Sequence, residues 1–130
     1  MCGIVGIVDA KNPIDINALC RARDALTHRG PDDADVWTDA ERGVGLAHRR
    51  LSIIDLSPKG RQPMVSADGS LVLIFNGEIY NFKALRGQLQ ELGHSFCSTS
   101  DTEVILRAYE EWALDAIPRL NGMFALALYD

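Results

Sequence analysis

The side chains with the clearest chemical potential stand at the start of the chain. Cys2 follows the initiator methionine, so removal of Met1 exposes a thiol and an α-amine on one residue. A free α-amine has a pKa of about 8, so part of it is a neutral base at pH 7 that can take the thiol proton. This arrangement is typical of a nucleophile that carries its own base. The alternative interpretation is a small apolar residue at the start of a strand.

Charged residues at two places far apart in the sequence could each bind a charged group of a ligand. The cluster His48-Arg49-Arg50 stands at the end of a strand-like segment, and a guanidinium there offers a bidentate fork to a carboxylate; the alternative is a surface salt bridge. Asp101 lies in the first turn of a predicted helix, where the helix dipole favours its charge, and it could equally bind an ammonium group. The local pattern does not separate the two interpretations of Asp101.

A third candidate is the Asn76-Gly77-Glu78 segment, which follows the apolar run LVLIF. Asn-Gly after a strand is first of all a turn signal. The functional interpretation is an oxyanion hole made of the Asn76 side-chain amide and the Gly77 backbone N–H. Both are neutral donors that could face an anionic tetrahedral intermediate.

The three histidines raise a competing hypothesis for how the thiol is activated. In a Cys–His hydrolase an imidazole activates the thiol, but the spacing of His28, His48 and His94 selects none of them, so we expect structural roles. Three cysteines without a CxxC pair argue against a disulfide framework and a zinc site. We therefore expect no metal and a reducing, cytoplasmic compartment.

The composition is that of an ordinary globular domain, with 130 residues of which 47% are hydrophobic and 24% charged. The net charge of -5 does not supply the basic surface that nucleic-acid binding requires. No apolar run approaches the roughly 20 residues of a membrane span, and the N-terminus lacks the positive region of a signal peptide. We expect one domain with neither nucleic acid nor a membrane as partner.

Strands and helices must alternate to position these residues. Helical spacing predicts helices that begin after Asp15, Asn81 and Ser100, and Ser100 with Glu103 has the pattern of a capping box. The mixture of strands and helices predicts a layered α+β architecture and not a parallel βαβ sheet. Apolar and β-branched runs predict strands at residues 3–8, 43–49, 71–75 and 123–129.

Six motifs follow one another in the sequence and end in a seventh segment: MCGIVGI, HRGPDD, HRRLSIIDLS, QP, FNGEIYNF and SDTE, then NGMFALALYD. Together they resemble the glutaminase domain of asparagine synthetase-type enzymes, which are class II glutamine amidotransferases, over essentially the whole chain. The resemblance implies an Ntn-hydrolase fold, a four-layer αββα sandwich of antiparallel sheets with Cys2 at the start of a central strand. It also implies hydrolysis of glutamine to glutamate and ammonia through a γ-glutamyl thioester.

The same resemblance assigns roles to individual residues. Cys2 is the nucleophile and its α-amine the base, while Arg50 holds the α-carboxylate of glutamine and Asp101 receives the α-ammonium. Asn76 and Gly77 form the oxyanion hole. No metal or organic cofactor is implied for this half of the reaction. The remaining residues implied to border the glutamine are Leu51, Ser52, Ile53, Ile54 and Glu78.

The family's synthetase domain, which uses ATP and Mg, is absent from this sequence, and the family's glutaminase domain continues past the NGMFALALYD strand. We expect residues 1–130 to be an incomplete glutaminase domain that supplies ammonia to a synthetase domain in cis or in a partner subunit; a homo-oligomer is left open. Two alternatives also stay open. One is a non-catalytic module that binds glutamine or mediates assembly, and the other is an amidotransferase that serves an acceptor other than aspartate.

Overall fold

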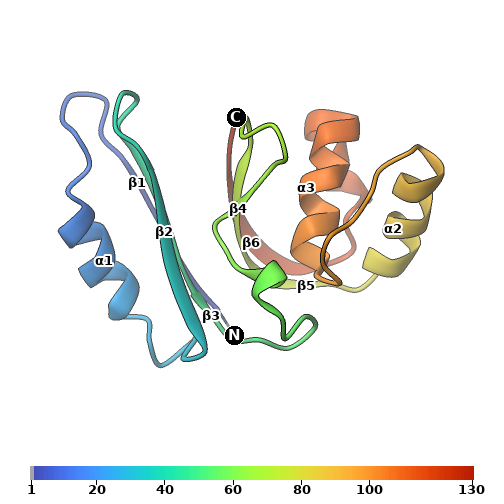
Figure 1. Ribbon diagram of the computed structural model, residues 1–130, viewed down its shortest axis with the longest axis horizontal. Helices are drawn as coiled ribbons and strands as arrows, with labels where there is room; N and C mark the ends of the chain where they lie inside the picture. The colour runs from blue at the N-terminus through green and yellow to red at the C-terminus, as the bar shows by residue number, and fades with distance from the viewer. Residues whose placement is uncertain (1) are drawn as a thin grey trace.

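The computed structural model describes residues 2–130 as two three-stranded antiparallel sheets that face each other (Figure 1). The strand order is β1-β3-β2 in one sheet and β4-β5-β6 in the other. The strands are β1 (Gly3–Val8), β2 (Asp33–Asp39), β3 (Val44–Arg50), β4 (Met64–Val65), β5 (Val72–Ile79) and β6 (Gly122–Tyr129). The helices are α1 (Ile16–Asp24), α2 (Phe82–Glu91) and α3 (Asp101–Trp112), with short 3₁₀ segments η1 (Pro58–Gly60) and η2 (Ala113–Arg119).

Helices cover the outer faces of both sheets and complete four layers. Figure 1 shows α1 against the β1-β3-β2 sheet, and α2 and α3 on the far side of the other sheet. This arrangement confirms the expected αββα sandwich. On α1, Leu19 is fully buried. It packs closely over Gly45 of β3, where an added Cβ would lie 3.0 Å from Leu19 Cδ2.

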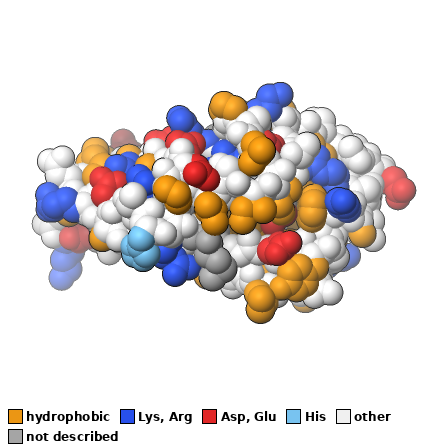
Figure 2. Space-filling model, turned by 90° about the horizontal axis from the view of Figure 1, so that it is seen from below, with side chains coloured by type: hydrophobic (Ala, Val, Ile, Leu, Met, Phe, Trp, Pro, Cys, Tyr) orange, Lys and Arg blue, Asp and Glu red, His pale blue; other side chains and the backbone are white. Residues whose placement is uncertain are grey.

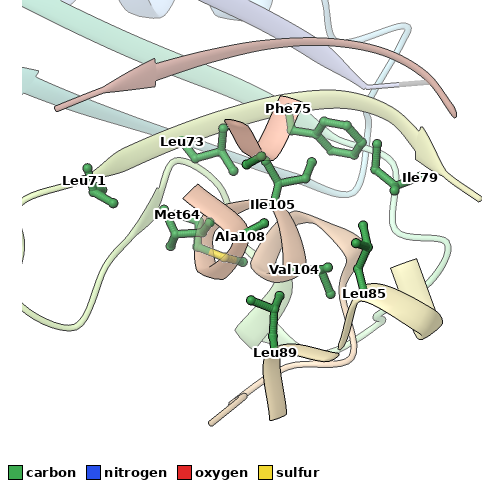
Figure 3. Close-up of a cluster of buried hydrophobic side chains, with 12 residues drawn as sticks. Met64, Leu71, Leu73, Phe75, Ile79, Leu85, Leu89, Val104, Ile105 and Ala108 are labelled. Atoms are coloured by element: carbon green, nitrogen blue, oxygen red, sulfur yellow. The ribbon is translucent and has the colours of Figure 1, made fainter. Parts of the chain in front are cut away.

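Strand β5 divides its side chains between two apolar clusters. Leu73 and Phe75 point toward α2 and α3 and pack with the buried residues of both helices (Figure 3). Val72 and Ile74 point the other way and pack between the two sheets. Because side chains alternate along a strand, Asn76 lies on the same face as Val72 and Ile74, toward the first sheet.

The four predicted strands and the three predicted helices are confirmed, with ends that shift by a few residues. Strand β5 runs on to Ile79 because its pairing with β6 continues as far as Gly122. The sequence pattern predicts neither β2, which is rich in aspartate, nor β4, which has only two residues. The expected central strand after Cys2 is wrong within residues 2–130: β3 is hydrogen-bonded on both sides, and β1 lies at an edge.

The capping box predicted at the start of α3 is only half formed. The Ser100 hydroxyl accepts a hydrogen bond from the N–H of Thr102 at 3.1 Å, as an N-cap should. The Glu103 carboxylate instead accepts the backbone N–H groups of Cys97 at 2.9 Å and Ser98 at 2.7 Å. The bend before the helix offers Glu103 these closer donors, so its side chain does not reach back to Ser100.

No helix within residues 2–130 is long and apolar enough to cross a membrane. The three cysteines of this range are free. Cys20 is half-buried on α1, whereas Cys97 is exposed in the bend before α3. The strand-like segment around Cys97 predicts a small core residue there, and this prediction is wrong because Cys97 is exposed.

Candidate active site

A cavity of about 420 Å³ lies where the end of β3 meets the middle of β5 and the start of α3. Ser52 is outside its lining, and its backbone N–H donates to the Asp32 carboxylate at 2.8 Å. All the other predicted site residues line this one cavity: Cys2, Arg50, Leu51, Ile53, Ile54, Asn76, Gly77, Glu78 and Asp101.

Cys2 is half-buried at the start of β1, beside the residue that follows β3. The N–H of Leu51 donates to Cys2 Sγ at 3.4 Å, and Sγ lies 3.7 Å from the Leu51 carbonyl oxygen, so the Leu51 backbone fixes the position of the thiol. Arg29 Nε donates to the carbonyl oxygen of Cys2 at 3.0 Å and fixes its backbone. Met1, whose removal would free the α-amine of Cys2, lies outside the described residues.

Arg50 is buried at the base of the cavity and is only 7% exposed. Its guanidinium donates to the carbonyl oxygens of Ser57, at 3.0 Å, and of Asp55. A Cβ at Gly60 would overlap the Arg50 Nη2 atom, so this glycine makes room for the guanidinium. The surface salt bridge considered for Arg50 is wrong, because the side chain is buried on backbone carbonyls. A guanidinium has five N–H donors, so some stay free for a ligand.

Within residues 2–130, β4 is the one strand that pairs with the cavity-facing edge of β5, and it does so only at Val72 and Leu73. Backbone N–H groups alternate along a strand, so those of Phe75, Gly77 and Ile79 all point to this edge. The first donates to the Gln62 side chain at 2.6 Å and the third to the Asp101 carboxylate at 3.2 Å. The N–H of Gly77 lies between them and points into the cavity.

The Asn76-Gly77 turn considered for this segment is wrong, because both residues lie inside β5 and pair with β6. Asn76 lines the cavity from the face that looks toward the first sheet. Its Oδ1 atom is buried without a hydrogen-bond partner among residues 2–130. Natural proteins seldom leave such an atom unpaired, so the unpaired Oδ1 atom marks Asn76 as a functional candidate.

Asp101 is the first residue of α3, and its side chain is only 5% exposed. Burial raises the pKa of this carboxyl, although hydrogen bonds from backbone N–H groups, including that of Ile79, oppose the shift. The N-cap role belongs to Ser100. Asp101 therefore presents a buried carboxylate to the cavity while it also lies at the positive end of the helix dipole.

Asp55 ties the segment after β3 to the residues before α3. Its carboxylate accepts the N–H of Ser57 at 2.8 Å, the hydroxyl of Ser57 at 2.6 Å and the N–H of Thr99 at 2.8 Å. Burial raises the pKa of Asp55, but these hydrogen bonds outweigh it and bring the pKa to about 2. The Asp55 carbonyl also accepts from Arg50, so Asp55 helps to set the spacing between Arg50 and Asp101.

Sequence reasoning did not assign to the site four buried polar residues that line the cavity, namely Asp55, Gln62, Ser100 and Thr102. Gln62 is half of the Gln-Pro motif in the family resemblance, and that motif is the one signal that could have pointed to it. Asp55 and Thr102 lie in the HRRLSIIDLS and SDTE motifs, but the contacts that tie them to the site join distant parts of the chain. Asp55 accepts from Thr99, 44 residues away, and Thr102 accepts from Gln62, 40 residues away.

None of the three histidines lines the cavity. His48 is buried between the sheets, where its Nε2 atom lies 3.0 Å from the Phe75 carbonyl oxygen, and burial lowers its pKa to about 4. His94 pairs with the Glu111 carboxylate at 2.8 Å, and His28 is exposed. The contacts of Cys2 Sγ are with Leu51, so this geometry does not support the Cys–His hypothesis.

The mouth of the cavity is apolar. Ile53, Tyr80 and Met123 line it and are respectively 71%, 54% and 74% exposed. Hydrophobic side chains gather over the middle of the face seen in Figure 2, with single acidic groups among them. Among the residues that the structure describes, no group of three His, Cys, Asp or Glu side chains could hold a metal ion.

Comparison with known proteins places these observations in a family. The model of the glutamine amidotransferase domain matches residues 1–130. The chain is 44% identical to "Asparagine synthetase [glutamine-hydrolyzing] 3" of Bacillus subtilis (strain 168), with all of this chain and 21% of that protein covered. It is 36% identical to "Amidase chry2" of Gibberella zeae, again with all of this chain and 21% of that protein covered. The chain thus spans about a fifth of the length of these relatives.

A solved structure shares the fold. The glutamine phosphoribosylpyrophosphate amidotransferase of Bacillus subtilis, complexed with ADP and GMP, superposes with a TM-score of 0.79 over 98% of this chain and 35% of its own. The two sequences are 20% identical, so this likeness concerns the fold alone. The match of the family model to the whole chain, together with the 44% identity, is decisive. The chain belongs to the glutamine amidotransferase domain family.

Proposed function

We propose that this domain hydrolyses glutamine to glutamate and ammonia, with Cys2 Sγ as the nucleophile. The observation that carries the proposal is the single cavity lined by Cys2, Arg50, Asn76, Gly77 and Asp101, which come from four separate parts of the chain. A zwitterionic amino acid with a side-chain amide needs one cation, one anion, one nucleophile and donors for an oxyanion. This cavity contains that set.

Binding comes first in the proposed reaction. Arg50 takes the α-carboxylate with the donors that Ser57 and Asp55 leave free, and Asp101 takes the α-ammonium. Leu51, Ile53 and Ile54 border the substrate, with Glu78 at the exposed side, whereas Ser52 lies outside the lining and takes no part. These contacts leave the side-chain amide of glutamine toward Cys2.

Acyl transfer follows. The α-amine of Cys2 takes the thiol proton, and Sγ attacks the amide carbon. The carbonyl oxygen becomes anionic and accepts hydrogen bonds from Asn76 Nδ2 and the Gly77 N–H. The resulting α-ammonium of Cys2 gives the proton to the amide nitrogen, so ammonia leaves and a γ-glutamyl thioester remains. Water then attacks the thioester carbon, sulfur takes back a proton, and glutamate is released without any metal or organic cofactor.

The use of the ammonia follows by analogy with the relatives. We propose that it serves an ATP-dependent amidation in a synthetase domain of the same protein or of a partner subunit, where ATP and Mg would belong. The names of the Bacillus relatives favour aspartate as the acceptor, whereas the name of the Gibberella relative leaves another acceptor open. Three free cysteines in the described chain support a cytoplasmic location.

The test is Cys2→Ala in the full-length protein, with Cys20→Ala on α1 as the matched control. We expect the first variant to lose glutamine hydrolysis while it keeps ammonia-dependent synthesis, because the nucleophile serves only the release of ammonia. The control should keep both activities. Hydrolysis by Cys2→Ala would refute the proposal. Calorimetric binding of glutamine by the wild type without release of ammonia would favour the non-catalytic module instead.

A further inference from the structure

Two buried side chains hold Phe75, the residue directly before Asn76. From β3, His48 Nε2 lies 3.0 Å from the Phe75 carbonyl oxygen. From the opposite side, Gln62 Oε1 accepts the Phe75 N–H at 2.6 Å. His48 is 1% exposed and Gln62 is 5% exposed, so both contacts are shielded from water. The carbonyl that His48 contacts belongs to the peptide that leads into Asn76.

Each of these side chains also connects β5 to an element that carries a substrate-binding candidate. His48 stands two residues before Arg50 on β3. Gln62 Nε2 donates to the Thr102 hydroxyl at 3.1 Å, and Thr102 follows Asp101 on α3. Gln62 also takes the place of a strand partner. Strand β4 pairs with β5 only through residues 64–65, so it does not reach the N–H of Phe75, and the Gln62 side chain accepts that N–H instead.

The chemistry of the pair suits fixed positioning better than proton transfer. Burial lowers the pKa of His48 to about 4, so its ring is neutral at pH 7 and Nε2 must carry the proton to donate to a carbonyl. Nδ1 is then an acceptor, and it is buried without a partner among residues 2–130. Such an orphan costs stability that an apolar residue between two sheets would not cost. The hydrogen bond from His48 Nε2 to the Phe75 carbonyl is the one contact that offsets the cost of the unpaired Nδ1 atom.

We propose that His48 and Gln62 are positioning residues that fix the Phe75 backbone and thereby aim the Asn76 amide and the Gly77 N–H into the cavity. The inference rests on the proposed function, because it assigns these two donors to the oxyanion. Donors that develop their full strength only in the transition state must be held within a fraction of an ångström. Neither side chain touches the substrate in this arrangement.

The test compares His48→Leu and Gln62→Met with wild type in the full-length protein. We expect kcat for glutamine hydrolysis to fall about tenfold to a hundredfold in each variant, with KM for glutamine within about twofold of wild type. Alkylation of Cys2 by iodoacetamide needs no oxyanion hole, so its rate should stay unchanged. His28→Leu and Gln90→Met make the same changes at exposed positions and should alter none of these quantities.

Conservative variants separate positioning from general packing. His48→Gln places an amide N–H near the position of Nε2, and Gln62→Glu keeps an acceptor for the Phe75 N–H, so each should recover most of the lost kcat. If His48→Leu or Gln62→Met fails to fold, His48→Asn and Gln62→Asn take their place. These shorter polar side chains do not reach Phe75, and we expect the same loss of kcat from them.

Unchanged kcat in the folded variants would overturn the inference, and so would a rise in KM that accounts for the whole loss in kcat/KM. Slower iodoacetamide labelling in step with kcat would overturn it as well, because the defect would then lie at the thiol. Failure of the proposed function appears differently: glutamine hydrolysis by the wild type would be absent or would survive Cys2→Ala.

Discussion

Asp101 Oδ2 accepts the backbone N–H of Ile79 at 3.2 Å, so the first residue of α3 is bonded to the strand that carries Asn76 and Gly77. One carboxylate therefore occupies the edge of β5 and also faces the cavity. This contact holds Asp101 at a fixed distance from Asn76 and Gly77 on β5. It also makes Asp101 the residue at which structural and ligand roles can be separated most cleanly.

Asp101→Asn should weaken glutamine binding by about 2–4 kcal/mol, because the substrate ammonium loses a charged partner in a buried site. The free energy of unfolding should change by less than about 1 kcal/mol, since Ser100 caps the helix and the amide oxygen can still accept from Ile79. Calorimetric titration with glutamine and thermal unfolding measure the two effects. A lower Tm with unchanged affinity would overturn the ligand role.

Gly77→Ala should lower both stability and turnover. A Cβ at this position would lie 2.6 Å from Phe124 Cα on β6, so β5 and β6 would have to separate beside the two proposed oxyanion donors. We expect a loss of about 1–3 kcal/mol in the free energy of unfolding, together with a lower kcat. Gly87→Ala on α2 is the control, because a Cβ there meets open space and helix propensity favours alanine. Equal stability of the two variants would contradict the close approach.

Asp55→Asn should raise KM for glutamine by about tenfold, because the loop that holds Arg50 loses the charge-assisted bonds from Ser57 and Thr99. Asp68→Asn is the matched control. Its carboxylate organises the turn before β5 and also has a pKa of about 2, lowered by hydrogen bonds from Ser66 and Ser70, but it does not line the cavity. Steady-state kinetics should separate them; an equal effect on KM would mean that Asp55 acts only on stability.

His48 should make folding sensitive to pH between about 6.5 and about 4. Its pKa is lowered from 6.5 to about 4 in the folded protein, so over this range the unfolded chain binds a proton that the folded chain does not. Stability from this group is complete above pH 6.5 and is lost as the pH falls, by roughly 3 kcal/mol at the acid end.

Urea unfolding of wild type and His48→Gln at pH 7 and pH 4.5 measures this contribution. The other titrating groups are common to both proteins and cancel in the difference. We expect the wild type to lose more stability than the variant on acidification. Parallel losses would mean that the buried ring titrates normally.

Much of this architecture follows from local pattern. The apolar runs that became β1, β3, β5 and β6, and the cap at Asp15, needed no tertiary information. The sequence pattern did not predict strands β2 and β4, because their residues form strands only by pairing with β3 and β5. Tertiary contacts also explain why Glu103 does not complete the predicted capping box. Its carboxylate accepts the N–H groups of Cys97 and Ser98 in the bend before α3 and not that of Ser100.

The residues of the candidate site also differ in how far the local sequence reveals them. Cys2, Arg50, Asn76 and Asp101 could be singled out because their chemistry is visible in their residue types and neighbours. His48 and Gln62 lie in motifs of the family resemblance, but their contacts with Phe75, 27 and 13 residues away along the chain, are not visible in the local sequence. A side chain that acts by holding the backbone of another strand leaves no local signature.

The most direct measurement is the mass of the N-terminal peptide after the full-length protein is mixed with glutamine and quenched in acid within one turnover. We expect a peptide that begins at Cys2 and carries one γ-glutamyl group on its sulfur, and no such adduct in Cys2→Ala. Turnover with the γ-glutamyl group absent from Cys2, or turnover by a protein that still begins with Met1, would contradict it.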